Sequence, residues 1–301
     1  MKGIILSGGL GSRLRPITNV VSKQLLPVYD KPMIYYSLSV LIRAGIKDIA
    51  LITTNSAVKQ FAKLLGDGKR FGVNMEYITQ DAPNGIAESF LLAEQFIDGD
   101  SVCLILGDNM FHGSEEIISD CIQSNHRGCT LFGYKVKDPR AYGVAELDKL
   151  GNITGIEEKP QDPKSDISIT GLYVYDSTAV ERVKKQKPSA RGELEITDLN
   201  NSYIEDKSAR LFTLPDGVAW LDMGSPVGLL QASNYVQTIQ DRQGIQVGSP
   251  EICAFNNRMI GTEELLESYN HHKNTEYGKS FKKVIDEDFK VRNKWANTDT
   301  D

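Results

Sequence analysis

The segment GGLGSRLRP, which begins at Gly8, follows the first apolar run of the chain and combines three glycines with two arginines. Gly8, Gly9 and Gly11 allow the backbone to pass close to a phosphate group and to direct N–H groups toward it. Arg13 and the later Lys23 add positive charge where a leaving pyrophosphate would gather negative charge. The loop therefore indicates a phosphate site, although a plain glycine-rich turn with surface cations has the same composition.

The spacing of this loop excludes the two commonest phosphate-binding loops. The dinucleotide-binding pattern GxGxxG starts correctly with Gly9 and Gly11, but Leu14 occupies its third glycine position. The P-loop pattern GxxxxGKS/T does not occur in the chain. If the segment binds phosphate, it is therefore a phosphate-binding loop of another kind.

Two aspartates are candidate metal ligands. Asp108, in LILGDNMF, comes directly after a strand-like run, and ligands of open parallel sheets bind outside the carboxyl ends of the strands. Mg²⁺ takes one or two protein carboxylates together with phosphate oxygens, and Asp222 in WLDMGS could supply the second. Each has a structural alternative: Asp108 can belong to a strand-end turn with Gly107, and Asp222 can complement the N-terminus of the following helix.

Three residues in the second half are candidates for contact with a ligand. Lys159 ends a strand-like run in IEEKP, but most lysines are simply solvated. Gly171 lies inside the β-branched and aromatic run ITGLYVYD, which indicates close approach of a ligand or of another backbone. Glu193, in RGELEITD, could accept sugar hydroxyls or could complement a helix dipole.

Strand-like runs alternate with amphipathic stretches in the first half of the chain, which is typical of a mostly parallel sheet covered on both faces. Pro32 suits the first turn of a helix, and Gly45 suits its C-terminal cap. We expect strands at 3–6, 49–53, 73–78, 102–106, 130–136, 143–147 and 169–176, and helices at 32–44, 56–65, 86–96, 226–242, 262–270 and 276–286.

The net charge and the cysteines narrow the class of protein. The chain has 301 residues and a formal net charge of −6, which argues against binding to duplex DNA or to an anionic membrane surface. No apolar run reaches the roughly 20 residues of a membrane helix, and no signal peptide precedes the first strand. The four cysteines lack CxxC spacing, which favours reduced thiols in the core. We therefore expect a cytoplasmic protein with neither nucleic acid nor a membrane as its partner.

Taken together, the motifs resemble those of the sugar-nucleotide pyrophosphorylases, a family of nucleotidyltransferases, and most closely its short bacterial glucose-1-phosphate thymidylyltransferases. The resemblance is strong over residues 1–245 and looser beyond. The motifs that carry it occur in the family's order: GGLGSRLRP, SKQLLPVYDKPMIYY, NGIAESF, GDN, YGV, EEKP, TGLYVYD, RGELEITDLN and LDMGS.

The resemblance implies a Rossmann-like three-layer α/β/α sandwich with a mostly parallel mixed sheet and a small C-terminal helical element. It implies a catalytic domain over residues 1–245 and a C-terminal helical appendage over 246–301, with a polar tail from about 287. By the same resemblance the appendage forms a subunit interface, and the protein is a homo-oligomer, specifically a homotetramer.

The resemblance also implies roles for individual residues. Arg13, Lys23, Asp108 and Lys159 are the expected catalytic residues, and Asp108 and Asp222 are the expected ligands of Mg²⁺. The expected nucleotide-binding residues are Gly8, Gly9, Gly11, Gln24, Gln80 and Gly85. The expected sugar-phosphate-binding residues are Tyr142, Gly143, Glu158, Lys159, Gly171 and Glu193.

The implied reaction transfers a nucleotidyl group from dTTP to glucose 1-phosphate and releases dTDP-glucose and pyrophosphate. Two alternatives stay open: the same chemistry with UTP or CTP and another sugar 1-phosphate, and a non-catalytic subunit that binds nucleotide sugars. The sequence departs from the family pattern at Leu10, at Asn84 and Glu88 in the base-reading segment, and at Met223 and Ser225 in the metal segment.

Overall fold

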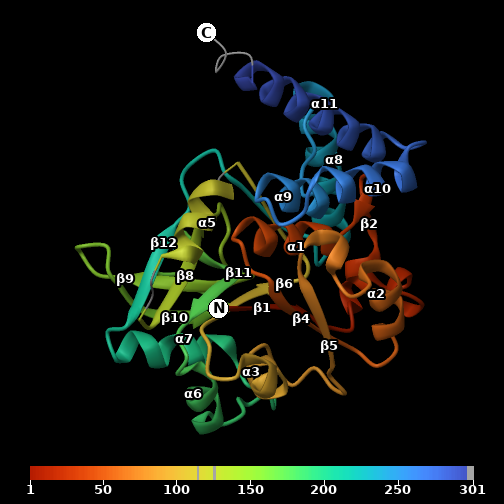
Figure 1. Ribbon diagram of the computed structural model, residues 1–301. Coiled ribbons are helices and arrows are strands. Elements are labelled where there is room, and N and C mark those ends of the chain that lie inside the picture. Colours follow the sequence, from red (N-terminus) through yellow and green to blue (C-terminus); the bar gives the residue numbers. More distant parts are fainter. Residues whose placement is uncertain (114, 125–126, 297–301) are drawn as a thin grey trace.

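A mixed β-sheet forms the centre of the molecule (Figure 1). The computed structural model describes residues 1–113, 115–124 and 127–296. Within these residues the main sheet runs in the order β10-β9-β11-β6-β1-β4-β5, while β8 pairs with β11 and β12 pairs with β8. The bounds of its strands are β1 Lys2–Ser7, β4 Asp48–Thr53, β5 Asn74–Thr79, β6 Val102–Leu106, β8 Cys129–Lys135, β9 Gly143–Leu147, β10 Ile153–Glu158, β11 Ile167–Tyr175 and β12 Ala209–Thr213.

Alternate side chains of the central strands enter different cores. Ile5 and Ile105 lie in the core on one face of the sheet, and Ile4 and Leu104 lie in the core on the other. The first face is covered by α1 (Ile34–Arg43), α2 (Val58–Leu65) and α5 (Glu115–Gln123). The second is covered by α3 (Glu88–Leu92), α4 (Glu94–Ile97), α6 (Ala179–Lys185) and α7 (Ile196–Glu205). This arrangement confirms the expected three-layer α/β/α sandwich.

The strands expected from the sequence overlap the observed ones closely, but the helices expected at 32–44, 86–96 and 276–286 differ in detail from the observed ones. Pro32 does not lie in the first turn of α1: it belongs to the short strand β3 (Lys31–Pro32), which pairs with β2 (Pro27–Val28) before the helix begins. The helix expected over 86–96 is divided at Ala93 into α3 and α4. Gly45 follows the end of α1 with φ 73°, as expected for a helix cap.

A two-stranded ribbon outside the main sheet brings the acidic motifs together. Strand β7 (Asn109–His112) pairs antiparallel with β13 (Ala219–Asp222), and Asn109 lies opposite Asp222 in the register. Helix α8 (Pro226–Gln243) follows, and the Ser225 hydroxyl caps it by accepting a hydrogen bond from the Gly228 N–H at 3.1 Å. The ribbon therefore fixes Asp222 beside the turn that ends β6.

The side-chain oxygen of Asn109 joins this ribbon to the main sheet. It accepts hydrogen bonds from the N–H of Gly171 on β11 at 3.1 Å and from the indole Nε1 of Trp220 on β13 at 2.6 Å. A Cβ atom at Gly171 would lie 2.8 Å from both Cγ and Oδ1 of Asn109. The sequence predicted that Gly171 allows the close approach of another group, and the structure shows that this group is the Asn109 side-chain amide.

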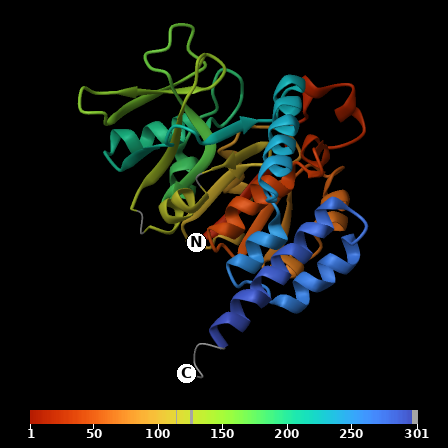
Figure 2. The same cartoon turned by 90° about the horizontal axis from the view of Figure 1, so that it is seen from above.

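The C-terminal helices pack against α1, on the side of the molecule that holds the first core (Figure 2). They are α9 (Pro250–Asn256), α10 (Thr262–His272) and α11 (Glu276–Ala296). Helix α11 continues past residue 287, so the polar segment is helical as far as Ala296, and residues 297–301 lie outside the described part of the chain. In the described residues, no helix has the length and apolar composition of a membrane span.

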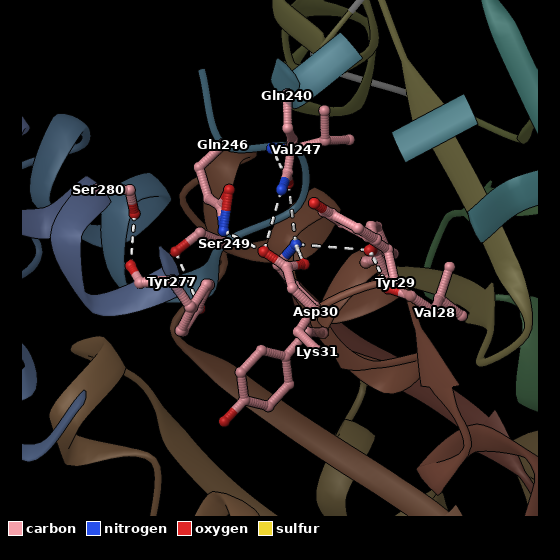
Figure 3. Close-up of polar contacts among 12 residues, drawn as sticks. Val28, Tyr29, Asp30, Lys31, Gln240, Gln246, Val247, Ser249, Tyr277 and Ser280 are labelled. Atoms are coloured by element: carbon pink, nitrogen blue, oxygen red, sulfur yellow. Dashed lines mark hydrogen bonds and ion pairs between the residues drawn. The ribbon is translucent and has the colours of Figure 1, made fainter. Parts of the chain in front are cut away.

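A buried polar network connects the β2–β3 hairpin to α8 and to the segment before α9 (Figure 3). The Lys31 ammonium group contacts Asp30 at 2.5 Å and donates to Gln240 Oε1 at 3.2 Å, while the Gln246 amide donates to Asp30 at 2.7 Å. Burial lowers the pKa of Lys31, and the Asp30 charge opposes this shift. Removing either partner of the Lys31–Asp30 pair would leave the other charge buried and unpaired. The pair and its hydrogen bonds to Gln240 and Gln246 therefore stabilise the contact between the hairpin and the C-terminal part of the chain.

We expect Gly171→Ala to lower the free energy of unfolding by about 1–3 kcal/mol, because the added methyl group has no room beside Asn109. Gly155→Ala is the matched control on β10: its Cβ would lie 3.7 Å from the nearest atom, in ordinary contact. Urea unfolding of both variants measures the difference. Equal losses in the two variants would contradict the packing account.

Candidate active site

A continuous cleft lies at the carboxyl ends of β1 and β6. It consists of two adjoining pockets of about 320 and 550 Å³, and both are lined by Leu6, Gly9, Tyr142 and Lys159. Most of the residues expected at the site line this cleft. Those in its walls are Gly9, Arg13, Lys23, Gln24, Gln80, Gly85, Asp108, Tyr142, Gly143, Glu158, Lys159, Gly171, Glu193 and Asp222.

The glycine-rich loop follows β1 and forms one edge of the cleft. A Cβ atom at Gly8 would lie 1.9 Å from Gln80 Oε1, and one at Gly11, where φ is 60°, would lie 2.9 Å from Thr18. A Cβ atom at Gly9 would have no neighbour within 4 Å, so the backbone there faces open space. Gly8 and Gly11 therefore allow the loop to pack closely against Gln80 and Thr18, whereas the backbone of Gly9 is exposed to the cleft.

Two carboxylates and two cations meet at the centre of the cleft. Lys23 Nζ lies 2.5 Å from Asp108 Oδ2, and Arg13 Nη2 lies 4.0 Å from Asp222 Oδ2. Burial raises the pKa of the Asp222 carboxyl, and the nearby charge of Asp108 raises it further. The hydrogen bond from the Gly224 N–H and the positive charges of Arg13 and Lys23 lower the pKa of Asp222. The carboxylates therefore repel each other, and the cations compensate this repulsion in part.

Gly224, which the sequence interpretation did not single out, has a place in this centre. Its N–H donates to Asp222 Oδ1 at 2.9 Å. A Cβ atom there would lie 2.5 Å from Arg13 Nη2, 3.0 Å from Asp222 Oδ1 and 3.1 Å from Asp108 Oδ2. The absent side chain leaves space that both carboxylates face. The glycine in the motif LDMGS was the feature of the sequence that could have indicated this position.

The opposite wall of the cleft carries a third cation. Lys159 follows β10 with φ 47°, and its N–H donates to the Tyr142 carbonyl oxygen at 3.0 Å. Its ammonium group contacts Glu158 Oε1 at 2.9 Å, while Glu158 Oε2 accepts from the Thr197 hydroxyl at 3.0 Å. The Lys159 side chain is 52% exposed, so it can reach a ligand from this wall.

The loop with Glu193 lies next to the loop with Gly85. Leu194 N–H donates to the Asn84 carbonyl oxygen at 2.7 Å, and the Leu194 carbonyl oxygen accepts from Ala87 N–H at 3.1 Å. Gly85 has φ 107°, and a Cβ atom there would lie 2.2 Å from the Leu194 oxygen. Only glycine permits this approach, which brings the expected base-reading and sugar-binding segments into direct contact.

Some contacts at the site had no clear signal in the sequence. Asn109 and Trp220 hold the acidic motifs in place, and the Tyr142 and Trp220 rings pack with centroids 5.1 Å apart. Arg191 lines the cleft and pairs with Glu195 at 2.9 Å. The motifs GDN and WLDMGS contained Asn109 and Trp220, but their mutual contact depends on pairing between distant segments.

The comparisons with known proteins agree with this geometry. The family model described as nucleotidyl transferase matches residues 2–239. The glucose-1-phosphate thymidylyltransferase of Neisseria gonorrhoeae is 50% identical over 280 residues, which cover 92% of this chain and 97% of the relative. The enzyme of that name from Mycolicibacterium smegmatis is 45% identical over 286 residues, which cover 95% and 99%.

Solved structures are similar over the same region. A putative glucose-1-phosphate thymidylyltransferase from Bacillus anthracis, in complex with sucrose, aligns with a TM-score of 0.72 at 41% identity and covers 78% of this chain and 94% of its own. A UDP-glucose pyrophosphorylase complexed with UDP-glucose aligns with a TM-score of 0.70 at 22% identity, covers 79% and 98%, and supports the fold alone. The glycine loop, the paired aspartates and these extensive similarities show that the chain belongs to the nucleotidyl transferase family.

Proposed function

We propose that the chain transfers a thymidylyl group from dTTP to glucose 1-phosphate, giving dTDP-glucose and pyrophosphate. The observation that carries the proposal is the charge arrangement: Arg13 and Lys23 on one wall of the cleft and Lys159 on the other, with Asp108 and Asp222 at the centre. Two anionic substrates can be neutralised there from opposite sides. The names of the thymidylyltransferase relatives support the choice of substrates.

The reaction is an in-line displacement at phosphorus. An oxygen of the sugar 1-phosphate attacks the α-phosphorus of the nucleotide, and the bond from that phosphorus to the bridging oxygen of pyrophosphate breaks. The attacking phosphate is already ionised, so positioning and charge neutralisation account for the catalysis. Arg13 and Lys23 bind the triphosphate and the departing pyrophosphate. Lys159 holds the incoming phosphate, and Glu158 and Glu193 accept hydrogen bonds from sugar hydroxyls.

The carboxylate pair fits a divalent cation. Asp108 and Asp222 both face the space left beside Gly224, and burial together with mutual repulsion favours an added positive charge there. In the described residues no third side chain of a ligating type completes a cluster, which suits Mg²⁺, since Mg²⁺ takes its remaining ligands from phosphate and water. When bound, the ion would neutralise charge on the phosphate oxygens.

The nucleotide base lies, in this proposal, at the end of the cleft formed by Gln80 and Gly85, next to Gly8 and Gly9. Gln24, 1% exposed, lines the pocket that would hold the triphosphate. Tyr142, Gly143 and Gly171 shape the sugar-phosphate side.

Subunits would associate through the C-terminal helices, in a cytoplasmic homotetramer. Leu266 on α10 and Phe289 on α11 are 45% and 53% exposed, and a second copy of the chain could cover them.

We expect Asp108→Asn and Asp222→Asn each to lower kcat by about 100- to 1000-fold, because each removes a carboxylate charge that would hold Mg²⁺ beside the reacting phosphates. Pyrophosphate release with Mg²⁺, dTTP and glucose 1-phosphate measures the loss. Circular dichroism should show an unchanged fold.

Asp286→Asn is the control for charge removal, because Asp286 lies on α11, away from the cleft, is 52% exposed and pairs with Lys282 at 3.6 Å. It should retain full activity. Near-full activity of Asp108→Asn would overturn the metal assignment, and no pyrophosphate from the unaltered protein with any nucleotide and sugar phosphate would favour the non-catalytic alternative.

We expect Lys159→Met to raise the KM for glucose 1-phosphate by at least about tenfold, with a small effect on the KM for dTTP, because the proposal assigns Lys159 to the incoming phosphate and Arg13 and Lys23 to the triphosphate. Lys164→Met is the matched control: Lys164 lies in the same loop, is 63% exposed and pairs with Glu146. Steady-state kinetics with each substrate varied in turn separates the two effects. Equal changes in both KM values would place Lys159 elsewhere.

A further inference from the structure

We infer that Glu88 is a positioning residue that fixes the orientation of the Gln80 amide and thereby makes the cleft select pyrimidine bases that carry an N3–H group. The inference rests on the proposed function.

Glu88 accepts two amide hydrogen bonds at the start of α3. Its Oε2 accepts from Gln80 Nε2 at 2.7 Å, and its Oε1 accepts from Asn84 Nδ2 at 2.8 Å. An ionised carboxylate has no proton to donate, so each amide must turn its NH₂ group toward it. The Gln80 side chain therefore has one orientation.

This orientation leaves the Gln80 oxygen on the opposite side of the amide, against the glycine loop. That oxygen lies 1.9 Å from the position a Gly8 Cβ would occupy, and Gln80 lines the cleft together with Gly9 and Gly85. Gln80 is only 4% exposed, and its backbone N–H donates to the Thr53 carbonyl oxygen at 2.8 Å. The amide is thus a fixed acceptor in a nearly buried position.

A fixed acceptor discriminates between pyrimidines. Thymine and uracil carry a hydrogen on N3 and can donate to the Gln80 oxygen, whereas N3 of cytosine is itself an acceptor and would be repelled. An uncharged glutamine at position 88 could donate as well as accept, so Gln80 could turn over and present its NH₂ group to the base. The charge on Glu88 therefore excludes the orientation that suits cytosine.

The comparison of UTP with CTP tests this inference directly, because the two nucleotides differ only in the base. Pyrophosphate release with glucose 1-phosphate and Mg²⁺ gives kcat/KM for each nucleotide. The proteins compared are the unaltered chain, Glu88→Gln and the control Glu94→Gln. Glu94 lies on the neighbouring α4, is 48% exposed and pairs with Lys184.

We expect the unaltered chain and Glu94→Gln to prefer UTP to the same degree, and Glu88→Gln to reduce the UTP-to-CTP ratio by about tenfold, the effect of one hydrogen bond. No preference in the unaltered chain, an unchanged ratio in Glu88→Gln, or an equal loss with both nucleotides would overturn the inference. Calorimetric binding of UTP and CTP gives the same ratio without turnover. Absence of pyrophosphate from every pair would therefore refute the proposed function, while the binding ratio would still decide the role of Glu88.

Discussion

The hydrogen bonds to the Asn109 side-chain oxygen hold the site in its geometry. That oxygen ties Gly171 on β11 and Trp220 on β13 to the residue directly after Asp108, in a position that is 3% exposed. Two carboxylates that repel each other must stay close together here, and nothing in their own chemistry favours this. The hydrogen bonds to the buried Asn109 amide hold the backbone next to Asp108 in place despite the repulsion between the two carboxylates. The positive charges of Lys23 and Arg13 reduce this repulsion.

The carboxylate pair explains the distribution of cations around the cleft. Lys23 is 15% exposed and contacts Asp108 directly, whereas Arg13 is 63% exposed and stands 4.0 Å from Asp222. An exposed cation at longer distance contributes little to stability. Its position is better suited to a phosphate group that arrives with the substrate. In the proposed function, Lys23 therefore mainly compensates the charge of the carboxylate pair, and Arg13 mainly binds the nucleotide.

The sequence predicted the layers of the fold and most residues of the cleft, because local patterns carry that information. Strand runs, the glycine loop and the residues after strand ends are visible within a few positions. The pairing of β7 with β13 was not predictable, because it joins Asn109 to Asp222 across more than a third of the chain and leaves no local periodicity. For the same reason the strand pattern around Gly171 indicated a point of close approach without showing that Asn109 is the neighbour. Pro32 was assigned to a helix because its preference for a first turn is real, but pairing with Pro27 in a hairpin took precedence.

The contact between Leu194 and the Asn84–Ala87 segment has a consequence for altering the enzyme's products. Glu193, proposed to contact the sugar, and Gly85, proposed to contact the base, are far apart in the chain, which suggests two segments that could be exchanged separately. Two backbone hydrogen bonds join them, and a glycine is required where they meet. A loop taken from a relative with another sugar preference would bring a different backbone against the base-side segment. Segments 81–88 and 189–195 therefore form one exchangeable unit, and a chimaera should carry both from the same donor.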